Sequence, residues 1–304
     1  MYNGIINIYK EKGFTSHDVV AKLRGILKQK KIGHTGTLDP QAEGVLPVCL
    51  GNAARLCDML TEKSKEYEAV MIFGIATDTL DITGKTVRTC DRELEREEII
   101  KAIKSFEGEY DQVPPMYSAK KINGKKLYEL AREGIEVERK PVRVLIDKID
   151  IINISEDNRE IRFTVSCSKG TYIRSLCDDI GIRLGHASCM KELKRTRSGM
   201  FDLSDALTLK EIEEIVSEGK LEEHIISTEN ALSQYPAAYV NETGDKGLSN
   251  GNYLIRDSFR ECPASVDGQL VRVYDSAGRF KALYEFDEAK QIFKVFKMFP
   301  VREI

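Results

Sequence analysis

The sequence lacks the features of a membrane-spanning or secreted protein. No apolar run in its 304 residues approaches the roughly 18 residues that a membrane-spanning segment requires. The first residues, MYNGIINIYKEKG, contain no basic start, no long apolar stretch and no small-residue cleavage site, so we expect no secretion. Seven cysteines, an odd number without a C-x-x-C pair, are typical of reduced thiols in a cytoplasmic protein.

Signatures of metal and cofactor sites are missing as well. The 4 histidines are scattered, and the unpaired cysteines lack the spacing of zinc ligands. The glycine-rich loop GHTGTLDPQAEG at 33–44 contains neither the lysine of a phosphate-binding loop nor the G-x-G-x-x-G pattern of a dinucleotide site. We therefore expect no metal and no cofactor.

The net charge of −3 is unevenly distributed along the chain. Residues 115–200 contain 18 Lys and Arg against 12 Asp and Glu, whereas residues 201–234 contain 2 against 9. A basic middle is expected of a surface that binds phosphates, and the acidic stretch is more typical of a solvated helix. The lysine-rich segments AKKINGKK and KELKRTR, with Tyr117 and Tyr128 interleaved, fit either a groove that follows a nucleic acid backbone or an ordinary solvated surface.

Hydrophobic patterning predicts a mixed fold. Strands are predicted at 4–10, 44–51, 65–74, 141–155, 159–168 and within 187–201, and helices at 16–27 (with Ser16 as N-cap), 93–108 and 169–185. The elements do not alternate strictly as βαβ units, which favours the α+β class over a doubly wound sheet. From about residue 236, short strand patterns separated by glycine turns predict a small β domain, so we divide the chain into 1–234 and 235–304.

Asp39 is the strong acid–base or nucleophilic group of the glycine-rich loop. Pro40 follows it and disfavours the α conformation for the preceding residue, which helps to fix the direction of the carboxylate. A tight turn in which Asp39 accepts local backbone hydrogen bonds is the competing interpretation. The residues alone leave both interpretations open.

The segment GTYIRS at 170–175 is the second candidate. Gly170 permits close approach of the backbone to a ligand. Tyr172 and Arg174 would share a face on a strand but not on a helix. Arg174 could pair with a carboxylate, keeping it ionised and oriented, or it could be a surface arginine beside an aromatic core residue.

Seven segments between residues 10 and 201 carry recognisable motifs, at 10–16, 33–56, 64–69, 77–84, 113–134, 168–176 and 193–201. In this order they resemble the tRNA pseudouridine synthase B family, whose members modify the uridine of the T arm. The resemblance implies a catalytic domain of pseudouridine synthase type, with a mixed, antiparallel-rich sheet, followed by a small β-rich PUA-like domain. Glu11 departs from the family, which usually has proline at that position.

The resemblance also implies roles for six residues that the pattern alone leaves ambiguous. Asp39 would be the nucleophile or base, with Arg174 paired to it, and Tyr67 would stack on the target base. Tyr172 and Leu193 would line the pocket, and His34 would contact the RNA around the flipped nucleotide. Taken alone, Tyr67 is better explained as a core residue, and His34 fits a loop imidazole bonded to neighbouring backbone groups.

The implied reaction converts uridine 55 in the T loop of tRNA to pseudouridine. It breaks a C1′–N1 bond and forms a C1′–C5 bond, so it is an isomerisation without ATP, nicotinamide or metal. The carboxylate could attack covalently or remove a sugar proton to give a glycal, and the sequence leaves both routes open. We expect a cytoplasmic monomer that binds the T arm of tRNA, flips the uridine out, and needs no membrane and no obligate protein partner.

Two other functions remain open at this stage. An RNA chaperone would use the same basic groove to help tRNA fold. A hydrolase with an aspartate nucleophile would act on a small glycoside or nucleoside, although glycosidases usually place a second carboxylate about 5–9 Å away and the sequence suggests none near Asp39.

Overall fold

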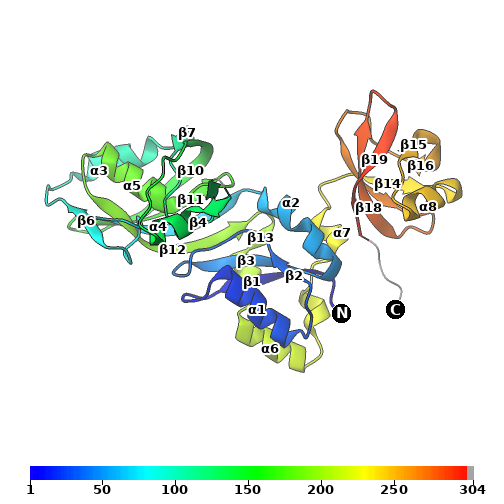
Figure 1. Cartoon of the computed structure of the whole chain (residues 1–304), viewed down its shortest axis with the longest axis horizontal. Helices are drawn as coiled ribbons and strands as arrows, with labels where there is room; N and C mark the ends of the chain where they lie inside the picture. The colour runs from blue at the N-terminus through cyan, green and yellow to red at the C-terminus, as the bar shows by residue number, and fades with distance from the viewer. Residues whose placement is uncertain (123, 300–304) are drawn as a thin grey trace.

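The computed structural model describes residues 1–122 and 124–299, in which two main β-sheets stand side by side (Figure 1). The larger sheet has nine strands in the order β1-β3-β12-β4-β11-β10-β7, with β2 attached to β3 and β13 to β12. Its strands pair antiparallel except for β12 with β3, which run parallel. The predicted α+β fold with an antiparallel-rich sheet is therefore confirmed.

Six strands of the larger sheet follow the predicted ranges, whereas the short strands β2, β7 and β13 were not predicted as separate strands. The strands of this sheet are β1 (Gly4–Lys10), β2 (Ile32–His34), β3 (Glu43–Leu50), β4 (Lys65–Phe73), β7 (Gly108–Gln112), β10 (Val142–Ile154), β11 (Glu160–Cys167), β12 (Ser188–Ser198) and β13 (Phe201–Asp202). Strand β11 alternates between buried and half-buried side chains along its length, because one face lies on the core. Two short hairpins lie outside this sheet: β5 (Ile75–Thr77) with β6 (Thr86–Thr89), and β8 (Lys121–Ile122) with β9 (Lys125–Lys126).

Helices cover the larger sheet at both ends (Figure 1). Helices α1 (Ser16–Ile26) and α6 (Leu209–Ser217) pack their apolar faces against β1 and β3. Helices α3 (Arg96–Lys104) and α5 (Ile173–Arg183) pack against β4, β10, β11 and β12. The shorter elements are η1 (Gly51–Leu56), α2 (Cys57–Thr61), α4 (Leu127–Arg132), η2 (Leu203–Asp205), η3 (Leu221–His224) and α7 (Thr228–Ala231).

The N-cap of helix α1 lies one residue earlier in the chain than we predicted. Thr15, not Ser16, is the N-cap: its side chain accepts a hydrogen bond from the backbone N–H of Asp18, and the Asp18 carboxylate accepts from the Thr15 backbone. This reciprocal capping box satisfies two backbone donors at once. The Ser16 hydroxyl is left free to bind another segment, the loop that holds Asp39.

The second sheet is built from residues late in the chain. Its strands are β14 (Ala237–Val240), β15 (Leu254–Ile255), β16 (Phe259–Glu261), β17 (Leu270–Tyr274), β18 (Phe280–Asp287) and β19 (Ile292–Met298), accompanied by α8 (Glu242–Ser249) and η4 (Arg256–Ser258). Leu283 and Phe299, from this late part of the chain, form one apolar cluster with Ile5 and Val45 of the larger sheet. The division at 234/235 falls between α7 and β14 and stays a prediction, and residues 300–304 lie outside the described part of the chain.

None of the helices in residues 1–122 and 124–299 combines the length and the hydropathy needed to cross a bilayer.

Candidate active site

The loop that carries Asp39 joins β2 to β3 and is held from two sides. The Ser16 hydroxyl accepts a hydrogen bond of 2.9 Å from the backbone N–H of Leu38, which ties the loop to the first turn of α1. The ammonium group of Lys10, a fully buried residue, donates to the carbonyl oxygen of Pro40 at 3.2 Å. These contacts fix the backbone on both sides of Asp39, so the carboxylate starts from a defined position.

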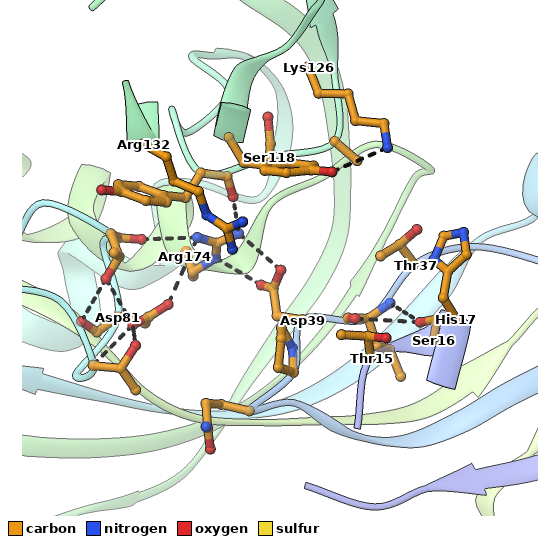
Figure 2. Close-up of a pocket in the computed structure, with 18 residues that line it drawn as sticks. Thr15, Ser16, His17, Thr37, Asp39, Asp81, Ser118, Lys126, Arg132 and Arg174 are labelled. Carbon is orange, nitrogen blue, oxygen red and sulfur yellow. Dashed lines mark hydrogen bonds and ion pairs between the residues drawn. The ribbon is translucent and has the colours of Figure 1, made fainter. Parts of the chain in front are cut away.

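Arg174, on the first turn of α5, forms a bidentate contact with the Asp39 carboxylate through two nitrogen atoms (Figure 2). Its Nε lies 2.9 Å from Oδ2 and its Nη2 lies 3.1 Å from Oδ1. The same guanidinium donates to the carbonyl oxygens of Thr79, at 3.0 Å, and Tyr117, at 2.8 Å. The Arg174 side chain is only 5% exposed, whereas Asp39 is 38% exposed, so the carboxylate is the member of the pair that a ligand can reach.

The surroundings of Asp39 also change its basicity. Burial raises the pKa of the Asp39 carboxyl, Arg174 acts in the opposite direction, and the nearby carboxylate of Asp81 raises the pKa further. A carboxylate with a raised pKa is a stronger base and a stronger nucleophile than a solvated one. Among the described residues, no group of three or more His, Cys, Asp or Glu side chains is arranged to hold a metal ion.

Two cavities meet at Asp39, and both have the size of small-ligand pockets. The first, the tyrosine cavity, has a volume of about 490 Å³ and includes Lys65, Tyr67, Tyr172, Leu193 and Arg195 in its walls. The second, the helix cavity, has a volume of about 680 Å³ and includes His17, Tyr117, Lys126, Tyr128 and Arg132 in its walls. Thr37, Leu38, Asp39, Ser118, Ala119 and Arg174 belong to both.

The tyrosine cavity brings together five of the six residues singled out from the sequence. Tyr67 on β4 and Leu193 on β12 lie on neighbouring strands, with Leu193 opposite Ala69. Tyr172 occupies the N-cap position of α5, and its backbone exchanges two hydrogen bonds with the side chain of Gln112, at 2.8 and 3.1 Å. Tyr172 therefore lies before the helix and Arg174 within it, which allows both to face the cavity although they are two residues apart.

His34 lies apart from the other five. It stands at the end of β2, half-buried, and lines neither cavity. Its ring packs edge-on against His17, with 5.2 Å between the ring centroids, and its Nδ1 has no hydrogen-bond partner. Burial lowers the pKa of His34. His17, which the sequence reasoning did not select, is the histidine that borders the helix cavity (Figure 2).

Two buried cations in the tyrosine cavity were also missed. Arg195 belongs to the basic stretch KELKRTR, for which we considered a solvated surface, yet it is only 1% exposed. Lys65 is 6% exposed, and burial lowers its pKa to about 8. The period-two pattern of strands holds the clue in both cases, because Lys65 shares a face with Tyr67 and Arg195 shares a face with Leu193.

Comparison with known proteins gives matches along nearly the whole chain. Residues 24–173 match the model of the TruB family pseudouridylate synthase (N terminal domain), and residues 174–233 match that of the tRNA pseudouridylate synthase B C-terminal domain. A tRNA pseudouridine synthase B of Lachnoclostridium phytofermentans is 51% identical over 98% of this chain and 99% of its own length. The tRNA pseudouridine synthase B of Bacillus subtilis is 42% identical over 96% of this chain and 95% of its own.

Solved structures agree with this at lower identity. A chain in the crystal structure of a Cbf5-Nop10-Gar1 complex has a TM-score of 0.75 and 29% identity, covering 98% of this chain and 85% of that chain. A chain in the structure of an H/ACA RNP bound to a substrate RNA containing 2′-deoxyuridine has a TM-score of 0.74 and 27% identity, covering 99% and 86%. These matches span both sheets, so the predicted fold, including the PUA-like second sheet, is confirmed. With half of its residues identical to those of a named member over almost the full length of both chains, the chain belongs to the tRNA pseudouridine synthase B family.

Proposed function

We propose that Asp39 acts on uridine 55 in the T loop of tRNA, which this protein, as a tRNA pseudouridine synthase, isomerises to pseudouridine. The observation that carries this role is the two-point contact between Asp39 and the buried Arg174, at 2.9 and 3.1 Å, where the two cavities meet. A carboxylate held in this way is oriented before the substrate arrives, which lowers the cost of reaching the reactive geometry. Family membership supports the reaction, and the geometry supports the residue.

The tyrosine cavity suits a flipped uracil ring. The aromatic face of Tyr67 and the apolar side chain of Leu193 offer two walls against which a base can pack, and Tyr172 adds a third. The ribose would then lie at the junction near Asp39. There the carboxylate would either attack C1′ or remove a proton from C2′, and both routes need it ionised and aimed by Arg174.

The helix cavity suits the nucleotides next to the target. Arg132 lies over the ring of Tyr128, with 5.4 Å from its guanidinium carbon to the ring centroid, and the Lys126 ammonium lies 3.3 Å from the Tyr128 hydroxyl (Figure 2). Cations beside an aromatic face bind a phosphate backbone and stacked bases together. In this proposal His34 affects RNA binding indirectly, because its ring packs against His17 at the border of the helix cavity.

The protein acts in this proposal as a cytoplasmic monomer with two domains, 1–234 and 235–304, and without an obligate protein partner. It differs in this from the matched chain of the related structure, which belongs to a Cbf5-Nop10-Gar1 complex. Size-exclusion chromatography of the protein alone and with tRNA measures the stoichiometry. A dimer in both states would contradict the monomer.

The test of the function is incubation with an unmodified tRNA transcript, followed by mapping of pseudouridine along the RNA. The expected result is pseudouridine at position 55 and none in a matched transcript with cytidine at that position. Modification at another uridine with none at position 55 would refute the proposed specificity. Hydrolysis of free uridine together with an unchanged transcript would favour the nucleoside hydrolase instead.

A further inference from the structure

Arg195 is a buried cation without a counter-charge. It lies on β12, is 1% exposed, and its Nε donates a hydrogen bond of 2.7 Å to the carbonyl oxygen of Val45. Its Nη2 is buried and has no hydrogen-bond partner. No carboxylate in the described residues forms an ion pair with Arg195, in contrast to Arg174, which has Asp39. An unpaired buried donor and an unpaired buried charge each cost stability, so a functional reason for keeping them is expected.

The position of Arg195 shows where a partner would bind. Arg195 lies opposite Tyr67 in the register of β12 and β4 and lines the tyrosine cavity. Lys65 lies on the same face of β4, and its ammonium group donates hydrogen bonds to the carbonyl oxygens of Thr61 and Lys63. The buried wall of the cavity is therefore positively charged, and Nη2 of Arg195 is a buried donor without a hydrogen-bond partner beside it.

The depth of this wall decides which part of the substrate meets it. Lys120 and Lys169 also border the tyrosine cavity. Lys120 is half-buried and Lys169 is exposed, so phosphates can reach both. A phosphate group carries two riboses and their neighbours with it, so it cannot enter as far as a residue that is 1% exposed. A flipped base is planar and is joined to the RNA through one glycosidic bond, so it can enter the cavity more deeply than a phosphate.

Resting on the proposed function, we propose that Nη2 of Arg195 donates a hydrogen bond to a carbonyl oxygen of the uracil ring and stabilises the negative charge that the base carries once its bond to the ribose is broken. When C1′–N1 breaks, the electron pair of the bond goes to N1 and spreads onto the two carbonyl oxygens. The base then turns, C5 bonds to C1′, and the proton on C5 is lost. Covalent attack by Asp39 and the glycal route both produce this anion, so the inference holds for either.

The position of Arg195 is itself fixed by its neighbours. Gly44 has a φ of +103°, and a Cβ added there would lie 2.2 Å from the carbonyl oxygen of Arg195. Strand β3 thus closes directly on the Arg195 backbone where β3 and β12 run parallel. A donor fixed before the reaction stabilises developing charge without the cost of reorganisation.

The experiment compares Arg195→Gln and Arg195→Lys with the wild type on two tRNA transcripts, one containing uridine and one containing 5-fluorouridine. Fluorine withdraws electrons and makes the base a better leaving group, so help from Arg195 matters less. Single-turnover rates of C-glycoside formation are measured after nuclease digestion, together with the Kd for tRNA and the thermal melt of each variant. Arg197→Gln is the matched control, since Arg197 lies on the same strand, pairs with Glu66 at 3.7 Å and lines neither cavity.

We expect Arg195→Gln to lower the rate on the uridine transcript by about 10²–10³-fold with its Kd within a factor of about three, as for loss of one donor to a developing anion. Arg195→Lys should recover part of the rate, and both deficits should shrink on 5-fluorouridine. Equal deficits on the two transcripts, an unchanged rate, or a loss confined to Kd would each overturn the inference. Should Arg195→Gln not fold, Arg195→Lys carries the same comparison. Failure of the wild type on both transcripts would refute the proposed function instead.

Discussion

Replacing Arg174 with lysine keeps the positive charge beside Asp39 but removes the planar fork that orients it. The arginine serves the two carboxylate oxygens of Asp39 and the carbonyl oxygens of Thr79 and Tyr117, at distances between 2.8 and 3.1 Å. A lysine ammonium is a single point and cannot reach acceptors on three sides at once. At least one of these acceptors is then left without its donor.

The expected loss of stability follows from the number of hydrogen bonds that lysine cannot make. One lost hydrogen bond to a charged group is worth about 1.5–3 kcal/mol, and loss of the whole buried pair would cost about 3–5 kcal/mol. We therefore expect Arg174→Lys to lower the free energy of unfolding by about 1.5–3 kcal/mol. A carboxylate displaced by about 1 Å loses on the order of 100-fold in rate, so we expect a single-turnover deficit of that size.

Urea denaturation and single-turnover pseudouridine formation measure the two effects. Arg162→Lys is the matched control, because Arg162 pairs with Glu68 at 2.6 Å but is 39% exposed. Exposed pairs contribute about 0.2–1 kcal/mol, so the control should lose little stability and no activity. If Arg174→Lys loses no more stability than Arg162→Lys, or if its rate stays within about threefold of the wild type, the guanidinium fork does not orient Asp39.

Three further predictions concern pH and packing. The rate should fall in acid with a midpoint above the ordinary aspartate value of 3.8, because burial raises the pKa of Asp39, and Arg174→Gln should move that midpoint higher; a pH–rate profile tests this. Burial lowers the pKa of Lys65 to about 8, so the folded protein loses a proton that the unfolded chain keeps up to 10.5. The free energy of unfolding should therefore gain from Lys65 as pH rises between these values, and urea melts of Lys65→Met should show a smaller rise. Gly44→Ala should lower the Tm more than Gly13→Ala, because both glycines have positive φ but only the Cβ at position 44 meets another backbone.

Much of the fold could be predicted because the strands follow simple rules. Strand β11 alternates its buried side chains, and β1 and β3 appear as short apolar runs, so their ranges were found from the sequence. The cap of α1 was misplaced by one residue, since Thr15 and Ser16 are both good caps. Asp18 decides between them, because its carboxylate accepts a hydrogen bond from the backbone N–H of Thr15.

The site was harder to predict because its partners are far apart in the chain. Asp39 and Arg174 are 135 residues apart, and nothing local to either residue indicates the other. Their pairing was expected only from the resemblance to a family. Arg195 was missed because charged residues are rarely buried without a partner, so a basic stretch such as KELKRTR normally indicates surface.

Asp39→Asn tests whether the Asp39 carboxylate performs the reaction. The variant and the wild type are compared for single-turnover pseudouridine formation at position 55 and for tRNA affinity. We expect loss of detectable modification with the affinity kept, because asparagine preserves the shape but is neither a nucleophile nor a base. Modification by Asp39→Asn at the rate of the wild type would show that the reaction does not need this carboxylate.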